Sequence, residues 1–187
     1  MDTQYPDFMI DLETTGTDPR YGAVIQIAAV RFNYHEESVD TSSMFDRCLT
    51  IAPGRFWDES TRDWWHKPDK IKVLRQIQMR AEDPYTVLKD FQQWAGTAPS
   101  QPHRFWGKPT HFDHSFISSY FNQFGMFNPF HYRYARDMNS FMAGMRGSPE
   151  APNVEGEIEF VGDVHNGLHD ALHQIKMLFH VKNGGRA

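Results

Sequence analysis

The stretch Phe8-Met9-Ile10-Asp11-Leu12-Glu13-Thr14-Thr15-Gly16 decides the fold. It begins as a short apolar run, which is typical of a strand buried on both faces. Because side chains alternate along a strand, Asp11 and Glu13 project from the same face. Two like charges this close repel each other, and burying them without a counter-ion is unfavourable. Mg²⁺ or Mn²⁺, which prefer oxygen ligands, would remove the repulsion, and a solvated turn at the strand end is the alternative.

Length and composition favour a single folded domain over residues 1–187. The chain is 40% hydrophobic and 23% charged, which suits one core spanning about 7–180. The net charge of -5 argues against a protein that coats nucleic acid nonspecifically, but it allows an enzyme that grips a few phosphates through metal ions. Cys48 is the only cysteine, so no intrachain disulfide forms. Since the sequence shows no secretion signal and no run of ~20 apolar residues, we expect a cytoplasmic protein without a membrane part.

The apolar patterns predict an α/β fold with a mixed central sheet. Three strand candidates with short connections come first and indicate an antiparallel meander, at about 7–12, 24–32 and 44–51. Helices and shorter strands then alternate, which favours further strands in parallel and helices on the faces of the sheet. The expected helices lie at about 58–65, 67–80, 83–95, 112–124, 137–143 and from 165 onward, and the expected strands at 103–107 and 131–135. Loops are expected at 97–102 and, long and mobile, at 146–163.

A third acid, Asp113, occupies a comparable position. It opens an amphipathic helix directly after a predicted strand, so it lies at the edge of the sheet where open α/β sheets bind ligands. As a negative charge at a helix N-terminus it could also be an ordinary cap. Either reading stays open from this residue alone.

His165 and Asp170 stand five residues apart, where the long loop meets the last helix. A histidine brought by a loop to an acidic cluster is a candidate general base, because imidazole titrates near neutral pH. Asp170 lies beside the apolar stripe of the helix and is free to face a crevice. We expect the neighbouring His169 and His173 to be non-catalytic.

Together these residues resemble the active-site pattern of the DEDDh-type 3'→5' exonucleases of the ribonuclease H-like superfamily. Asp11-Leu12-Glu13-Thr14-Thr15-Gly16 matches the first motif, Asp113 the second, and His165 with Asp170 the third. The resemblance implies a ribonuclease H-like sheet, antiparallel in its first strands and then parallel, flanked by helices. It covers most of the chain.

A narrower resemblance is to the small exonucleases of the mycobacterial Rv2179c-like and phage DexA-like group, whose members act on RNA or on DNA. The residues that carry it are Trp64-Trp65, Phe105-Trp106-Gly107-Lys108 leading into Phe112-Asp113, Arg133 and Arg136-Asp137. The dense aromatic run between Phe121 and Tyr134 has no counterpart that we can assign.

The resemblance implies two divalent ions, Mg²⁺ or Mn²⁺, held by Asp11, Glu13, Asp113 and Asp170, with His165 taking a proton from the attacking water. The expected reaction removes nucleoside 5'-monophosphates from the 3' end of single-stranded DNA or RNA. A nuclease-like module that binds nucleic acid without cutting it is the alternative. The oligomeric state stays open, with a homodimer among the options.

Substrate contacts are expected around this cluster. The 3'-hydroxyl would contact Thr14 and Thr15, and the bases would stack on tryptophans that could equally be core residues: Trp64, Trp65 and Trp106. Lys108 and Arg133 are expected phosphate contacts. The basic segment 67–80 is either a solvated helix face or an edge that guides phosphates.

Overall fold

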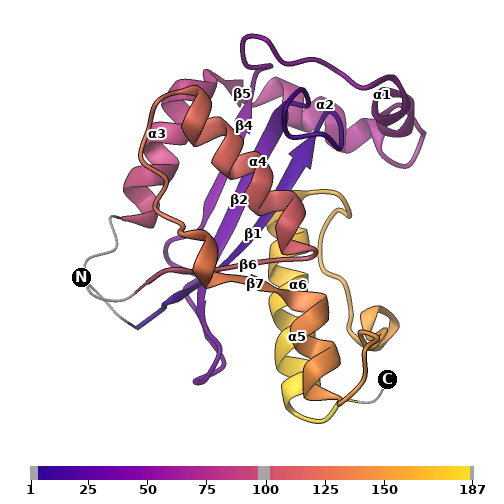
Figure 1. The fold of residues 1–187 in the computed structure, drawn as a ribbon. Coiled ribbons are helices and arrows are strands. Elements are labelled where there is room, and N and C mark those ends of the chain that lie inside the picture. Colours follow the sequence, from indigo (N-terminus) through magenta and orange to yellow (C-terminus); the bar gives the residue numbers. More distant parts are fainter. Residues whose placement is uncertain (1–3, 97–101, 186–187) are drawn as a thin grey trace.

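A mixed seven-stranded sheet forms the centre of the computed structural model, which describes residues 4–96 and 102–185. The strands are β1 (Asp7–Thr14), β2 (Val24–Asn33), β3 (Ser38–Val39), β4 (Phe45–Leu49), β5 (Ala81–Glu82), β6 (Arg104–Gly107) and β7 (Ala135–Asp137). Their order is β5-β4-β2-β1-β6-β7, with β3 paired to β2 (Figure 1). β1, β2 and β4 pair antiparallel, whereas β6 and β7 continue in parallel from β1. This is the mixed sheet that the sequence predicts.

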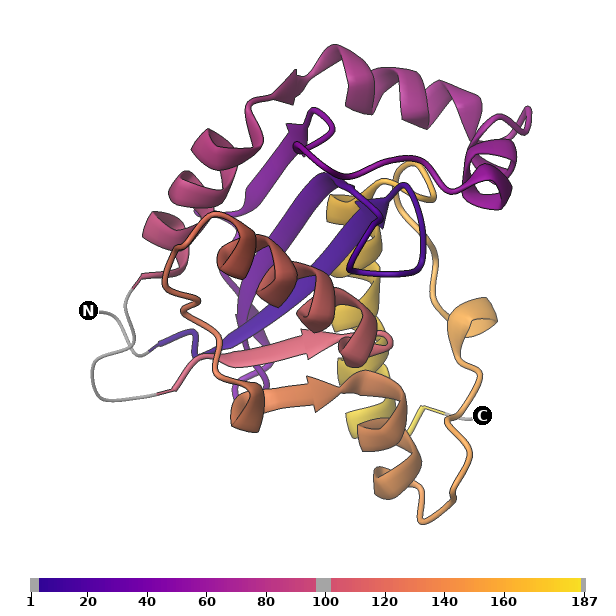
Figure 2. The same ribbon diagram turned by 45° about the horizontal axis from the view of Figure 1, so that its top comes forward.

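Helices cover both faces of the sheet (Figures 1 and 2). On one face, α3 (Pro84–Ala95) and α4 (Thr110–Gln123) pack over Phe8, Ile10 and Leu12 of β1. On the other, α5 (Met138–Met145) and α6 (Gly167–Lys182) pack over Met9. Asp11 and Glu13 alternate with the residues beneath α3 and α4, so they belong to the face that α6 covers.

A third apolar cluster closes the sheet beside the end of β1. It joins α1 (Glu59–Trp65) and α2 (Ile71–Met79) to Ile25 of β2 and Cys48 of β4. In Figure 2 these two helices lie near the carboxyl end of β1. Trp65 is buried in this cluster, so α1 is fixed next to the two acids of β1.

Local capping explains why two helices begin where the sequence predicts. The carboxylate of Asp83 accepts a hydrogen bond from the backbone N–H of Thr86, and Pro84 occupies the first turn of α3. Asp137 accepts in the same way from the N–H of Ser140 and begins α5. Both helices begin within one residue of the predicted start.

The structure corrects several predicted boundaries. The segment 131–135 is not a strand, because His131 Nδ1 accepts from the N–H of Arg133 and closes a 3-10 turn, η1 (Tyr132–Tyr134). The helix expected at 67–80 is confined to α2 because residues 67–70 form a turn in which Lys70 donates to the carbonyl of Lys67. The two short strands β3 and β5 were not predicted.

The long loop at 146–163 is found, with one 3-10 turn, η2 (Glu155–Glu157), and with Val154 buried. Most of the loop predicted at 97–102 lies outside the described residues. Within the part of the chain that the structure describes, no helix has both the length and the hydropathy needed to cross a bilayer.

Candidate active site

Asp113 lies close to the two acids of β1 because β1 and β6 run in parallel and α4 follows β6. The backbone N–H of Leu12, between Asp11 and Glu13, donates to Oδ1 of Asp113 at 3.2 Å. Asp113 is buried in the first turn of α4 rather than capping it, since the helix begins at Thr110 after Pro109. The interpretation of Asp113 as an ordinary cap is therefore wrong.

Gly107 allows this close approach at the end of β6. A Cβ at this position would lie 2.9 Å from the Cα of Thr110 and 3.0 Å from Oδ2 of Asp113. The backbone distance is shorter than real Cβ atoms show, and the distance to the carboxylate oxygen is tight enough that Asp113 would have to shift. A glycine at this position therefore lets α4 and the carboxylate of Asp113 approach the end of β6 closely.

The start of α6 brings the last two residues of the cluster to β1. Asn166 caps the helix by accepting from the N–H groups of Leu168 and His169. His165, the residue before the cap, has a φ of 65°, a left-handed conformation that histidine adopts more readily than most residues. Asp170 lies in the first turn of the helix.

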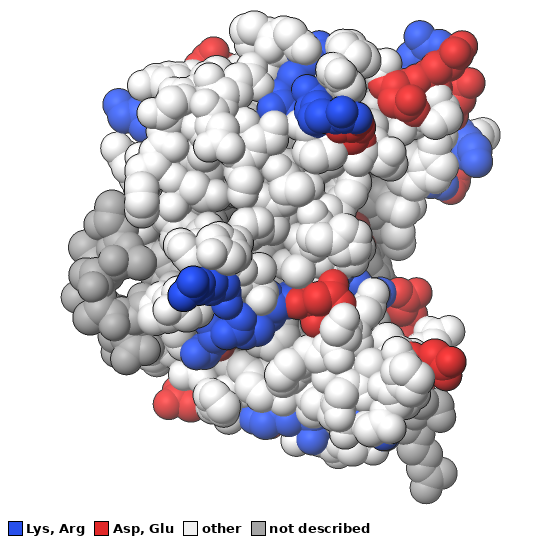
Figure 3. Space-filling view, in the orientation of Figure 1, with Lys and Arg blue, Asp and Glu red and all other residues white. Residues whose placement is uncertain are grey.

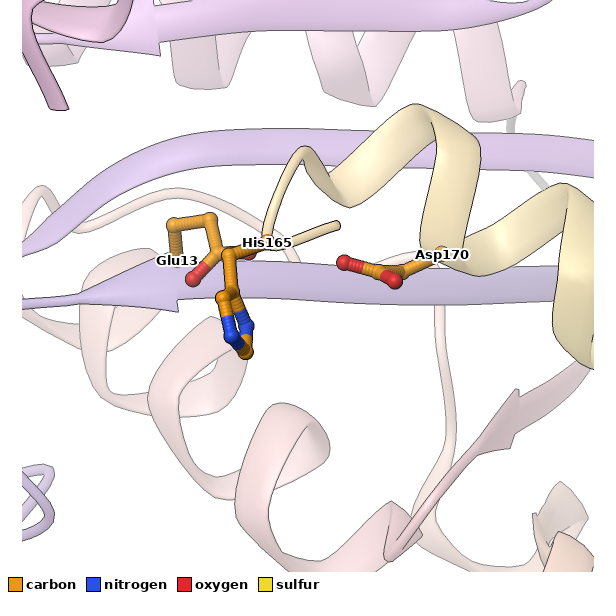
Figure 4. Close-up of side chains that lie close together, drawn as sticks. All are labelled: Glu13, His165 and Asp170. Carbon is orange, nitrogen blue, oxygen red and sulfur yellow. The ribbon is translucent and has the colours of Figure 1, made fainter. Parts of the chain in front are cut away.

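Glu13, His165 and Asp170 converge from a strand, a loop and a helix. Their ligand atoms all lie within 4.8 Å of one another. Figure 4 shows the side chain of Glu13 extending from β1, that of His165 from the loop and that of Asp170 from α6. The five residues singled out in the sequence thus lie in one place, and all five line a cleft of about 660 Å³.

Crowding of the carboxylates changes their protonation. Burial and the neighbouring Asp170 raise the pKa of Asp11 to about 7, while the amide of Gln174 and the charge of Lys108 act in the opposite direction. Burial, followed by the other acids, raises the pKa of Glu13 well above its ordinary value. Burial and Asp11 likewise raise the pKa of Asp113, and burial raises that of Asp170 to about 6. The four acids repel one another, as buried like charges do.

This arrangement fits a divalent metal centre. Each carboxylate is held beside another at a site where protein cations contribute little, and the donors are carboxylate oxygens with one imidazole nearby. Hard oxygen donors suit Mg²⁺ and Mn²⁺. A bound dication would offset the repulsion that raises these pKa values. Of the predicted ligands, Glu13 and Asp170 belong with His165 to the group whose ligand atoms lie within 4.8 Å of one another, and Asp11 and Asp113 line the same cleft.

His165 packs against Trp64 of α1, which in turn lies beside Lys70. The imidazole ring and the indole ring of Trp64 form a T-shaped contact, with ring centroids 4.8 Å apart. Lys70 Nζ lies 4.8 Å from the ring centroid of Trp64. Burial, followed by the positive charge of Lys70, lowers the pKa of His165. A lowered pKa keeps the imidazole neutral near pH 7 and able to accept a proton.

A second cleft of about 390 Å³ adjoins the first and shares Glu13 with it. Thr14 and Trp64 line this second cleft, and Lys108 lines the first. Lys108 forms an ion pair with Glu155 of η2, so its ammonium group is held at the rim of the cleft by the long loop.

Four of the expected substrate contacts are buried or lie away from the two clefts. Trp65 is 1% exposed, and its Nε1 donates to the carbonyl of Thr14 at 3.0 Å. Trp106 is 3% exposed, and its Nε1 donates to Oδ1 of Asp7 at 2.8 Å. Trp106 lines neither cleft, and Trp65 lies at the wall of the second cleft but is almost fully buried, so neither indole presents an exposed ring face to a base and both have the core role that the sequence left open.

Thr15 and Arg133 are the other two. The hydroxyl of buried Thr15 donates to the carbonyl of Phe56 at 2.7 Å and accepts from the N–H of Ala23 at 2.7 Å, so it has no free contact for a substrate. Arg133 lies in η1, before β7 begins, and lines neither cleft. The acids, in contrast, lie near the carboxyl ends of β1 and β6.

Two residues of the cleft were not predicted. Gln174 donates from Nε2 to Oδ1 of Asp11 at 2.7 Å. It lies one helical turn after Asp170, so the spacing of four could have identified it. His173, expected to be non-catalytic, also lines the cleft, and no hydrogen-bond partner of its buried Nδ1 is found among the described residues.

The fold is similar to those of solved nucleases. E. coli ExoI, solved with single-stranded DNA and zinc, superposes with a TM-score of 0.71 at 18% identity over 95% of this chain and 40% of its own. S. pombe Pop2p in its Mg²⁺- and Mn²⁺-bound form gives a TM-score of 0.67 at 12% identity over 96% and 83%. The nuclease domain of 3'hExo, a DEDDh family member bound to rAMP, gives 0.60 at 14% identity over 98% and 96%. This chain thus spans less than half the length of ExoI.

The chain shares its fold with these solved structures, of which 3'hExo is described as a DEDDh family member, and a cluster of acids with a histidine lies at the end of β1. The sequence matches the family described as "3'-5' exoribonuclease Rv2179c-like domain" over residues 6–181, and the chain belongs to that family. No curated protein matches the chain.

Proposed function

We propose that this protein removes nucleoside 5'-monophosphates one at a time from the 3' end of single-stranded nucleic acid. The observation that carries the proposal is the convergence of Glu13, His165 and Asp170 within 4.8 Å, beside Asp11 and Asp113, in one open cleft. Three chain segments meet there at the carboxyl end of β1, where ligands bind in open α/β sheets.

The acids would hold two divalent ions, Mg²⁺ or Mn²⁺. When bound, such ions lower the pKa of water and stabilise both the attacking and the leaving oxygens of a phosphodiester. Glu13, Asp11, Asp113 and Asp170 would supply the ligands. This assignment is supported by the burial and mutual repulsion that raise the pKa values of these carboxylates, because a cation would relieve both.

His165 is proposed as the general base. Its neutral imidazole accepts a proton from water as the water oxygen bonds to phosphorus, and the bond from phosphorus to the 3'-oxygen of the preceding nucleotide breaks. The departing 3'-oxygen takes a proton from solvent water, and the imidazolium returns its proton to solvent. The products are a nucleoside 5'-monophosphate and a strand one residue shorter with a new 3'-hydroxyl. The T-shaped contact with Trp64 helps to hold the imidazole ring in place.

The adjoining cleft is proposed as the site of the terminal nucleoside. Thr14 and Trp64 line it, which retains these two as substrate contacts, and Lys108 at the rim of the main cleft would pair with a phosphate. Thr14 donates its hydroxyl to the carbonyl of Gly16 at 2.8 Å, so its remaining lone pair is what it offers to a 3'-hydroxyl.

The sugar preference is tested directly by digestion. Single strands of DNA and RNA with the same sequence and a 5' label are incubated in parallel with Mg²⁺ and with Mn²⁺. We expect a ladder that shortens from the 3' end with either metal and none in EDTA. The family description names an exoribonuclease, while ExoI was solved with DNA, so both strands belong in the assay. Loss of both substrates only from the 5' end, or no hydrolysis of either, would contradict the proposal.

Two further parts of the proposal concern the setting of the enzyme. We propose that it acts in the cytoplasm, supported by the buried thiol of Cys48, which has no second cysteine to pair with. We also keep the single exonuclease domain and the option of a homodimer, which light scattering coupled to size-exclusion chromatography distinguishes from a monomer.

A further inference from the structure

The aromatic run that the sequence left unassigned lines a third cleft, of about 540 Å³. We call it the aromatic groove. It lies between one side of α4 and the segment that leads into β7, and its defining residues are His114, Asn122, Phe127, Phe130, Tyr132 and Tyr134. None of them lines either cleft of the active site.

Three aromatic side chains of the groove are exposed to solvent. Phe127 and Tyr132 are each 66% exposed and Tyr134 is 36% exposed. Tyr132 already stacks on His131, with ring centroids 4.4 Å apart and planes inclined by 29°. Neighbouring exposed aromatic rings are unfavourable in water unless they serve a contact, and flat rings in a groove are what unpaired bases stack on.

The charge of this region suits a polyanion. No carboxylate lines the groove, and the sequence from His114 to Arg136 contains no acid at all, although the whole chain has 24. The guanidinium of Arg133 lies 6.0 Å from the ring centroid of Tyr132. Arg136 donates to the backbone carbonyls of Arg133 and Ala135, and within residues 4–96 and 102–185 neither arginine has an ion-pair partner.

Figure 3 shows the same distribution on the surface. Lys and Arg atoms gather over the part of the molecule that holds η1 and β7, and the surface between them and the upper end of α4 is uncharged. A base-stacking surface beside unpaired arginines is the combination found where proteins bind single strands without reading their sequence.

The groove also lies within reach of the active site. His114 directly follows Asp113 on α4, and Asn122 lies two further turns along, about 12 Å away at ~1.5 Å per residue. A stacked strand advances ~3.4 Å per nucleotide, so this length accommodates about four nucleotides.

We propose that the aromatic groove binds single-stranded nucleic acid several nucleotides upstream of the 3' end. Bases stack on Phe127, Tyr132 and Tyr134, and Arg133 contacts a phosphate. The groove thereby holds a long substrate while the terminal nucleotide lies among the carboxylates. This inference adds a binding site to the proposed function and rests on that function for the position of the 3' end.

The test compares Tyr132→Ala with wild type on a 12-nucleotide single strand and on a dinucleotide, in RNA and in DNA. Losing one stacking residue should raise KM for the 12-mer by about ten-fold while leaving kcat unchanged, and the dinucleotide should be cleaved as by wild type. Arg133→Glu should weaken binding further and reduce its dependence on salt. Tyr85→Ala is the matched control, since Tyr85 is 48% exposed on α3 and lines none of the three clefts.

A binding assay keeps the inference separate from the proposed function. Fluorescence anisotropy of the labelled 12-mer is measured with the same variants, with Ca²⁺ in place of Mg²⁺. If wild type cleaves nothing but binds the 12-mer through Tyr132, the proposed function fails and the groove stands. If wild type cleaves both substrates and Tyr132→Ala matches it on the 12-mer, the groove is not a strand-binding site. Loss of self-association in Tyr132→Ala, without a change in strand binding, would assign the groove to a second copy and overturn the inference.

Discussion

Gln174 donates from Nε2 to Oδ1 of Asp11 at 2.7 Å, which ties the last helix to the strand that begins the acidic cluster. Because Gln174 stands one turn after Asp170, α6 contributes one carboxylate and orients another. Hydrogen bonds of this kind fix the rotamer of a metal-binding carboxylate, and their removal typically reduces metal affinity or activity by about 10- to 100-fold.

Replacing Gln174 by Leu should therefore weaken metal binding. We expect the Mg²⁺ concentration that gives half-maximal activity to rise about ten-fold, with a smaller change in activity at saturating metal. A metal titration of the hydrolysis rate measures this. Gln78→Leu, at an exposed position on α2, serves as the control. A metal dependence identical to that of wild type would show that Gln174 does not orient Asp11.

The metal-free protein should lose stability as pH rises. The ordinary pKa of an aspartate is 3.8, whereas that of Asp11 in the fold is about 7. Between those values the folded state holds a proton that the unfolded state has released, so stability is greatest below 3.8 for this group and falls as pH rises through about 7. Melting temperatures in EDTA at several pH values measure the effect.

Asp11→Asn removes the titrating carboxylate. It should flatten this pH dependence and raise the melting temperature in EDTA at pH 8, while abolishing hydrolysis in the presence of metal. If wild type instead gained stability between pH 5 and 8 in EDTA, to an extent that depended on Asp11, the account of the cluster as mutually repelling acids would be wrong.

Loss of the imidazole should slow the chemistry without unfolding the protein. His165→Ala is expected to lower kcat by about 10²- to 10⁴-fold, the usual contribution of a general base, and to change the shape of the pH–rate profile. His66→Ala provides a comparison, since His66 is exposed after α1. A profile unchanged in shape would remove His165 from the role of base.

Glu155 should compete with substrate for Lys108. It forms an ion pair with the lysine at the cleft, so it would compete with a substrate phosphate for that lysine if Lys108 contacts the phosphate as we propose. Glu155→Gln should lower KM for a single strand about two- to five-fold, in keeping with the small energy of an exposed ion pair. Lys108→Met should raise KM. Glu157→Gln is the control, because Glu157 lies in the same turn but pairs with His180; an equal effect of both changes would point to loop mobility rather than to Lys108.

A methyl group at Gly107, at the end of β6, should displace the neighbouring start of α4 and with it Asp113. Gly107→Ala brings a carbon to 2.9 Å from the Cα of Thr110, and backbone gives way less easily than a side chain. We expect a loss of about 1–3 kcal/mol in the free energy of unfolding and a reduced rate, because Asp113 must move. Gly144→Ala, in α5 at a position where no described atom lies within 4 Å, should leave the rate unchanged and raise the free energy of unfolding slightly, since Ala favours a helix over Gly by about 0.5–1 kcal/mol. Urea denaturation curves and initial rates on one substrate give the two readouts.

Much of the fold can be predicted from the local pattern of apolar and capping residues. The site can be predicted from the order of the acidic motifs and the histidine along the sequence. The apolar run before Asp11 and the Asp83-Pro84 pair carry their own signals, and both lead to the predicted elements. The predictions that were wrong concerned residues whose role depends on tertiary contacts. No local signal distinguishes Trp65 and Trp106, which are buried and donate to Thr14 and Asp7, from the more exposed Trp64.

The segment 131–135 illustrates the limit for short elements. Its alternation of aromatic and polar residues is that of a strand, but a side chain of its own first residue, His131, closes a turn instead. Gln174 and His173 were missed for a different reason. Their place in the cleft depends on how α6 rotates over β1, which the capping residue Asn166 and the contact of Gly167 with β1 determine.

The central claim is that the cluster of Asp11, Glu13, Asp113, His165 and Asp170 cleaves the last phosphodiester at a 3' end. The most direct measurement uses a single strand whose only label is the phosphate joining its last two nucleotides, incubated with Mg²⁺ and wild type or Asp11→Asn. We predict that wild type releases the label at once as nucleoside 5'-monophosphate and that Asp11→Asn releases none. Release of the label in an oligonucleotide or as inorganic phosphate, or release by Asp11→Asn at the wild-type rate, would contradict the claim.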